Sequence, residues 1–166
     1  MIKEYETQHL VDLELLALGG LGGRVDQSFS SIHQLYKCSP QRDLFLLSRK
    51  NLTCLLPVGR NRIHASKTTF GPTCGIVPTS GPTTITLQGF KWDLSKPFVI
   101  YSDVLEDFVT ELGGFVSTSN EILEEEAIVI SDKPVLWTVE IQEVEGKLDR
   151  RSTSQPIRQH KRVDLP

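Results

Sequence analysis

The first forty residues pass from an apolar run through a glycine-rich stretch to a segment with helical spacing. Val11–Leu18 is apolar and stops at Gly19-Gly20, which predicts a buried strand. Beyond the glycines, large side chains recur at three- and four-residue intervals, the spacing of an amphipathic helix that Pro40 closes: Val25, Phe29, Ile32, Leu35 and Tyr36. Strand, glycine loop and helix are half of a βαβ unit, so we expect its partner strands outside this chain or in another chain.

After Gln41 the spacing changes from helical to strand-like. Short runs bounded by Gly, Pro, Ser and Asp predict seven strands: Leu44–Ser48, Leu52–Pro57, Arg62–Ala65, Gly75–Val77, Thr83–Gly89, Ala127–Ser131 and Val135–Ile141. Such a series of short strands predicts a β-sandwich. We therefore expect an α+β chain with three parts. Residues 1–41 would be the last strand-loop-helix piece of an α/β nucleotide-binding domain, residues 42–143 a β-sandwich, and residues 144–166 a disordered tail.

Composition narrows the class of protein without assigning its chemistry. The chain has 166 residues, 39% of them hydrophobic, enough for the core of one domain or of one domain plus a remnant. A net charge of −3 and a pI near 5.8 do not support nucleic-acid binding. Its apolar runs are too short for a membrane helix. Three widely spaced cysteines fit a reducing compartment, and we expect a cytoplasmic protein.

The glycine-rich stretch Gly19–Gln27 is the first candidate site. Its glycines let the backbone turn tightly, and the amides at the start of the following helix favour an anion. Arg24 adds forked donors suited to phosphate, and Asp26 is able to hold Mg²⁺ or accept a proton from a hydroxyl nucleophile. The alternative is a tight strand-to-helix turn in which Asp26 caps the helix.

Two further segments carry side chains suited to a ligand. Trp92 follows a predicted strand, and its ring is able to stack on a flat heterocycle or a cation, although a core tryptophan is the commoner case. Residues Gly113–Asn120 hold three hydroxyls and an amide in succession. The alternative for this second segment is an ordinary turn or capping segment.

Six motifs follow one another in a recognisable order: Leu18–Gln27 (LGGLGGRVDQ), Leu55–His64 (LLPVGRNRIH), Cys74–Pro78 (CGIVP), Gly89–Leu94 (GFKWDL), Gly113–Asn120 (GGFVSTSN) and Val135–Thr138 (VLWT). In this combination the chain resembles the thiamine pyrophosphokinases, also called thiamine diphosphokinases, and most of all their eukaryotic and fungal members. The resemblance implies transfer of a pyrophosphoryl group from ATP to the hydroxyl of thiamine, giving thiamine diphosphate and AMP. It also implies Mg²⁺ as cofactor and a homodimer in which an α/β domain and a β-sandwich frame the site.

The resemblance assigns roles to individual residues. Arg24 and Asp26 would be catalytic, with Asp26 also a ligand of Mg²⁺, and Gln27 would contact substrate. The phosphate loop would comprise Gly20, Gly22 and Gly23. Trp92 would stack on thiamine across the dimer interface, beside a pocket lined by Ser117, Thr118, Ser119 and Asn120.

The chain also departs from the family pattern. The acidic Asp-x-Asp and Thr-Asp motifs that precede the glycine loop in the family are absent, and residues 96–112 match no family segment. We therefore expect negligible turnover from these 166 residues alone. The alternative function is a non-catalytic β-sandwich module, derived from the enzyme, that binds a ligand or mediates dimerisation.

Overall fold

The computed structural model describes residues 14–39, 41–94 and 108–142. Part of the predicted first strand, residues 11–13, lies outside the described residues. So do Pro40, most of the unmatched segment 96–112 and the predicted tail 144–166.

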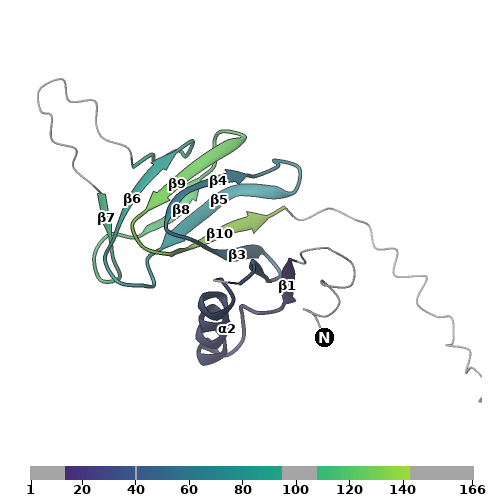
Figure 1. Ribbon diagram of the computed structural model, residues 1–166. Helices are drawn as coiled ribbons and strands as arrows, with labels where there is room; N and C mark the ends of the chain where they lie inside the picture. The colour runs from purple at the N-terminus through teal and green to yellow at the C-terminus, as the bar shows by residue number, and fades with distance from the viewer. Residues whose placement is uncertain (1–13, 40, 95–107, 143–166) are drawn as a thin grey trace, which may run out of the picture.

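The described chain is mostly β-sheet with one helix, as the sequence predicts (Figure 1). Its elements are β1 (Leu15–Leu18), α2 (Val25–Cys38), β2 (Leu44–Leu47), β3 (Asn51–Leu56), β4 (Gly59–His64), β5 (Phe70–Val77), β6 (Thr83–Gln88), β7 (Phe108–Thr110), β8 (Ser117–Glu121), β9 (Glu126–Ser131) and β10 (Val135–Ile141). They form a six-stranded sheet in the order β1-β2-β3-β10-β5-β8 and a four-stranded sheet in the order β4-β9-β6-β7.

The two sheets share one hydrophobic core. Ile76 and Val139 of the larger sheet pack in the same cluster as Ile85, Leu87 and Val129 of the smaller one, and all five are buried. In β6 the alternation of apolar and polar residues turns every second side chain into this core. Burial of each such side chain contributes roughly 1.5–3 kcal/mol, so the facing sheets supply most of the stability of the described fold.

The strand β1 finds its partner within the chain, contrary to the expectation that its partner strands lie elsewhere. It pairs in parallel with β2, so the expected boundary near residue 41 lies between two strands of one sheet. The run Leu44–Leu47 is apolar along its whole length, which suits an inner strand, and β2 pairs with β1 on one edge and with β3 on the other. Leu35 of α2 packs on Leu46 and Leu136 in a second, smaller core.

Four strands differ from the prediction. The strands β4 and β5 start earlier than expected, and β7 and β8 were not predicted as strands. β8 has the polar sequence STSNE, which lacks alternation of apolar and polar residues. It nevertheless pairs with β5 at the edge of the larger sheet, with an irregular register between Cys74 and Ile76. Edge strands tolerate bulges and polar side chains because one of their sides faces solvent.

Across residues 14–39, 41–94 and 108–142, no helix is both long and apolar enough to cross a membrane.

Candidate functional site

A pocket of about 710 Å³ lies between the segment after β6 and strand β8. It is lined by residues 91–94 and 115–120. The structure thus brings together the following predicted substrate-binding residues: Trp92, Ser117, Thr118, Ser119 and Asn120. We refer to this cavity as the Trp92 pocket.

The backbone after β6 presents Trp92 at the surface. Gly89 has a φ of +87°, and a Cβ there would lie 3.0 Å from the carbonyl oxygen of Glu126, so this turn requires glycine. The next residue, Phe90, is buried in the core, and its backbone N–H donates to the Asp93 carboxylate at 2.8 Å. Trp92 is left 52% exposed. The alternative that Trp92 is a core residue is therefore wrong.

Asn120 holds the backbone of Trp92 in place. Its Oδ1 accepts from the Trp92 N–H at 3.1 Å, and its Nδ2 donates to the Trp92 carbonyl at 3.0 Å. The same Oδ1 accepts from the Glu121 N–H at 2.8 Å. Asn120 is only 2% exposed, so these bonds satisfy a buried amide. Its polar atoms bind the protein backbone, and this geometry suits a residue that positions Trp92.

The remaining polar residues of β8 divide by burial. Ser117 is buried and accepts a hydrogen bond from Asn120, whereas Thr118 and Ser119 are exposed. Ser119 has a φ of 58°, within the left-handed region, and lies at the register shift in the pairing with β5, between the paired residues Ser117 and Asn120. Thr118 and Ser119 also line a neighbouring hollow of about 320 Å³ on the larger sheet.

Lys91 and Glu121 were not predicted from the sequence, although each directly adjoins a predicted residue. The Lys91 Nζ lies 2.6 Å from the Glu121 Oε1 and 4.8 Å from the centroid of the Trp92 ring. The backbone N–H of Lys91 also donates to the Glu121 carbonyl at 2.8 Å. The sequence signals that could have identified them are a basic residue next to Trp92 and an acidic residue next to Asn120.

The glycine loop forms the turn between β1 and α2. Gly19, Gly22 and Gly23 have φ values of 73°, 132° and 70°, a region that other residues rarely adopt. Gly20 serves close packing instead, because a Cβ there would lie 3.1 Å from the Cδ2 of Leu46. The N–H of Gly22 donates to the Ser28 hydroxyl at 3.3 Å, which folds the loop back onto α2.

Arg24 and Asp26 pair with each other at the start of α2. Arg24 Nε and Nη2 donate to the two carboxylate oxygens of Asp26 at 3.1 and 2.5 Å, and both side chains are exposed. These hydrogen bonds lower the pKa of the Asp26 carboxyl below its usual range. The helix N-cap is Arg24, without a side-chain cap, so the alternative role of Asp26 as the capping residue is wrong.

Within one chain the two parts of the predicted site stay separate. Among the described residues, those that line the Trp92 pocket are 91–94 and 115–120, so the structure does not bring Arg24, Asp26 or Gln27 to it. Gln27 lies in the first turn of α2, where its carbonyl accepts from the Ser31 hydroxyl.

The described residues do not make a Mg²⁺ site by themselves. Asp26 is the only acidic side chain between residues 19 and 39, and both of its oxygens pair with Arg24. Among the described residues there is also no group of three or more His, Cys, Asp or Glu that could hold a metal ion. Mg²⁺ bound to phosphates takes one or two carboxylates plus the substrate oxygens. Asp26 fits only as one member of a larger ligand set.

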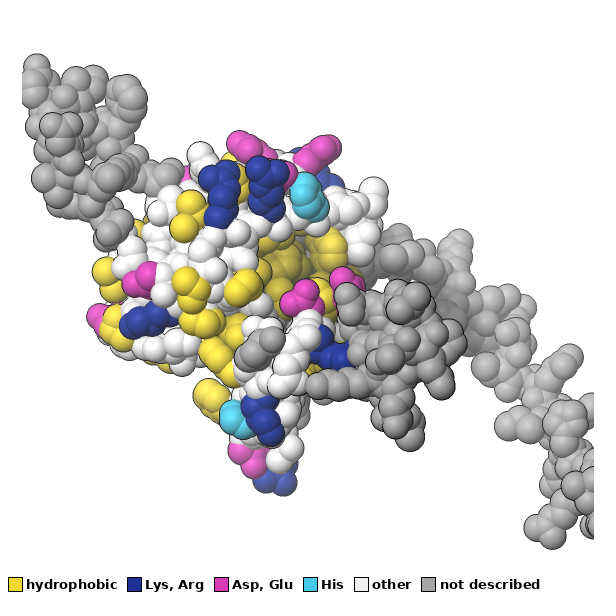
Figure 2. All heavy atoms as spheres, in the orientation of Figure 1, with side chains coloured by type: hydrophobic (Ala, Val, Ile, Leu, Met, Phe, Trp, Pro, Cys, Tyr) yellow, Lys and Arg dark blue, Asp and Glu magenta, His cyan; other side chains and the backbone are white. Residues whose placement is uncertain are grey.

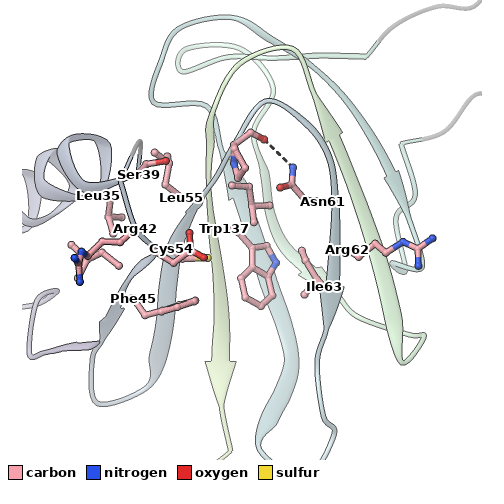
Figure 3. A pocket seen from close by; sticks show the side chains of 14 residues that line it. Leu35, Ser39, Arg42, Phe45, Cys54, Leu55, Asn61, Arg62, Ile63 and Trp137 are labelled. Carbon is pink, nitrogen blue, oxygen red and sulfur yellow. Dashed lines mark hydrogen bonds between the residues drawn. The ribbon is translucent and has the colours of Figure 1, made fainter. Parts of the chain in front are cut away.

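A second pocket, of about 370 Å³, is lined by residues of α2, β2, β3 and β4 and by Trp137 of β10 (Figure 3). Phe45 and Cys54 line one side and Ile63 the other, with the indole of Trp137 between them in this view. Figure 2 shows a hollow of hydrophobic side chains below a row of basic side chains and a histidine. Trp137 is only 6% exposed, so of the two tryptophans this one is the core residue.

Comparisons with known proteins agree with the motifs. Residues 60–136, which include Trp92 and all of β8, match the family described as "Thiamin pyrophosphokinase, vitamin B1 binding domain". Thiamine pyrophosphokinase 2 of Arabidopsis thaliana is 36% identical over 151 residues, which cover 90% of this chain and 49% of the relative. The thiamine pyrophosphokinase of Saccharomyces cerevisiae is 32% identical over 145 residues, covering 78% of this chain and 40% of that protein.

Solved structures give the same result. Thiamin pyrophosphokinase from Candida albicans superposes with a TM-score of 0.67 at 29% identity, covering 80% of this chain and 45% of that one. The yeast enzyme structure superposes with a TM-score of 0.66 at 26% identity, covering 85% and 46%. The chain spans about half the length of the curated relatives it matches. With motifs, sequence matches and fold in agreement, the chain belongs to the thiamine pyrophosphokinase family.

Proposed function

We propose that this chain binds thiamine in the Trp92 pocket and is the thiamine-binding part of a thiamine diphosphokinase. The reaction would transfer the pyrophosphoryl group of ATP to the hydroxyl of thiamine. In that reaction the hydroxyl oxygen attacks the β-phosphorus, the bond from that phosphorus to the α-phosphate oxygen breaks, and AMP leaves. The hydroxyl proton passes to a base or to water.

One observation carries the proposal: the exposed Trp92 ring stands beside polar groups in a pocket inside the matched vitamin B1 binding domain. Thiamine joins a permanently cationic thiazolium to a flat aminopyrimidine, and an exposed indole face attracts both. The exposed hydroxyls of Thr118 and Ser119 are suitable hydrogen-bond partners for the aminopyrimidine. The pocket thus offers a stacking surface and polar contacts for one ligand.

For the transfer step we propose that the glycine loop and the start of α2 contact the ATP phosphates. Arg24 supplies a fixed positive charge and forked donors, and Gln27 a neutral amide, beside backbone amides at a helix N-terminus. Phosphoryl transfer depends mainly on positioning and charge neutralisation, which suits these groups. Mg²⁺ would neutralise further phosphate charge. Asp26 is a proposed ligand only together with carboxylates from outside the described residues.

A homodimer would join the two separated parts. In one chain the glycine loop does not line the Trp92 pocket, so we propose that a partner chain brings one part to the other. The cytoplasmic location predicted from the sequence also stays a prediction.

The alternative function is a non-catalytic β-sandwich module that binds a ligand or mediates dimerisation. Titration of the purified chain with thiamine by calorimetry tests the shared claim, and we expect saturable one-site binding. Assay of AMP and thiamine diphosphate then separates the two functions. We expect negligible turnover from the chain alone, and turnover after fusion to the part of the Arabidopsis relative that lies outside the match. A fusion that binds thiamine but stays inactive would favour the module. Absence of thiamine binding would refute the enzyme function and a thiamine-binding module, and would leave dimerisation as the role of the module.

A further inference from the structure

The contacts around Trp92 include the Lys91–Glu121 ion pair, which the proposed thiamine-binding role does not require. We propose that the Lys91–Glu121 pair covers one face of the Trp92 ring and makes the pocket selective for a cationic aromatic ligand that stacks on the other face. This inference rests on the proposed function, because it concerns the ligand at Trp92. It assigns a specificity-determining role to two residues outside the predicted site.

The first step is the occupation of one ring face. The Lys91 ammonium lies over the Trp92 ring, 4.8 Å from the centroid, at a distance typical of a cation–π contact. Trp92 is nevertheless 52% exposed and lines the pocket, so the proposal places the ligand on the ring face that Lys91 does not cover. Stacking from one side only fixes which way a flat ligand enters the pocket.

The second step is that the backbone holds the pair in this position. Lys91 and Glu121 are joined both by the 2.6 Å ion pair and by the 2.8 Å bond from the Lys91 N–H to the Glu121 carbonyl. The isolated bridge between Phe90 and Ile122 and the bonds of Asn120 to Trp92 align the same two segments. The charges therefore lie at the ring before any ligand arrives, and little ordering entropy is lost when one binds.

The third step is electrostatic. An ammonium over the ring would repel a second cation on the opposite face and use up part of the ring's attraction for it. Glu121 balances that charge, so a cationic ligand meets a neutral pair. Removal of the Glu121 charge alone would leave the Lys91 ammonium unpaired, and a cationic ligand would then meet a positive charge. At separations of ~7 Å and an effective dielectric constant between about 40 and 80, this costs roughly three- to sevenfold in affinity.

The experiment compares two ligands on four forms of the whole chain: the natural chain, Glu121→Gln, Lys91→Met, and the double variant. The ligands are thiamine and its neutral half, 4-amino-5-hydroxymethyl-2-methylpyrimidine, both titrated by calorimetry. Glu121→Gln should weaken thiamine binding about three- to sevenfold and change binding of the neutral pyrimidine less than twofold. Lys91→Met should not weaken thiamine binding, and the double variant should restore most of the loss. Glu126→Gln is the matched control, because Glu126 pairs with Arg62 and His64 instead.

Equal weakening of both ligands by Glu121→Gln, or no change in either, would overturn the inference. A second measurement without ligand separates its failure from that of the proposed function. Trp92 is the exposed tryptophan, so quenching of its fluorescence by iodide should rise, and quenching by caesium should fall, in Glu121→Gln. Unchanged quenching refutes the charge pair whatever thiamine does. Altered quenching without any thiamine binding refutes the proposed function, and the selectivity with it.

Discussion

The variants Trp92→Ala and Trp137→Ala should rank in opposite order for loss of stability and for loss of thiamine affinity. Trp92 is 52% exposed beside the candidate pocket, and Trp137 is 6% exposed within the core. Each is thus a control for the other, since the deleted side chain is the same. If Trp92 binds thiamine, its replacement should chiefly reduce affinity. Replacement of Trp137 should chiefly reduce the free energy of unfolding.

The magnitudes follow from burial. A buried tryptophan covers ~150–250 Å², about half of which applies to Trp92, so at ~25 cal/mol per Å² its loss costs at most about 2–3 kcal/mol. The Trp137→Ala change loses nearly the whole area and leaves a cavity, for a cost of about 3–5 kcal/mol. At roughly 4 °C per kcal/mol for a domain of this size, the melting temperature should fall by at most ~8–12 °C for Trp92→Ala and by ~12–20 °C for Trp137→Ala.

Thiamine affinity should rank in the reverse order. Loss of the stacking face and its attraction for the thiazolium should cost Trp92→Ala about 1.4 kcal/mol or more, which is a tenfold weaker Kd. Trp92→Phe should keep much of the affinity, because a ring face remains. Calorimetric titration and thermal melting of the same purified variants provide both values. A large drop in melting temperature for Trp92→Ala, with unchanged affinity in the folded protein, would refute our placement of Trp92 in the site.

Four further predictions concern other parts of the chain. Asn120→Ala should destabilise the fold by about 1–3 kcal/mol and weaken thiamine binding in urea-melt and titration experiments, because it removes a buried amide that holds the Trp92 backbone. Asp26→Ala, in an active fusion, should lower kcat in the AMP assay and leave thiamine affinity within about twofold. An equal loss of kcat and of thiamine affinity would contradict the proposed role of Asp26 at the metal and the phosphates. Burial raises the pKa of the Cys54 and Cys74 thiols to about 12, so their folded pKa values exceed the unfolded ones. The contribution of these two thiols to stability should therefore be constant below pH ~9 and fall as the pH rises from ~9 toward 12, measured by urea unfolding, and a rise in stability with pH in that range would contradict this. Amides of Leu15–Leu18 should exchange faster than those of β10, because within the described part of the chain β1 is an edge strand paired only with β2; equal protection would show that β1 is as stable as the core.

Local patterns were sufficient to place most of the regular structure. The helix α2 follows from three- and four-residue spacing, and β6, β9 and β10 follow from alternation or continuous apolar runs. Such patterns report which side of an element faces the core, and that is fixed within a few residues. The strand β8 was not predicted from the sequence, because an edge strand with an irregular register needs no apolar face. The parallel pairing of β1 with β2 was not predicted either, because it depends on how α2 packs against the sheet and not on the local sequence.

The candidate site shows the same division between local and long-range information. The sequence by itself identified Trp92, the polar run of β8 and the glycine loop, because ligand-binding chemistry needs those residue types wherever they lie. Only the tertiary structure decided that Trp92 is at the surface, that Asn120 binds its backbone across 28 positions of the chain, and that Lys91 lies over its ring. Those contacts depend on the register in which the segments after β6 and along β8 meet. Register is set by the whole sheet, and one motif read alone does not carry it.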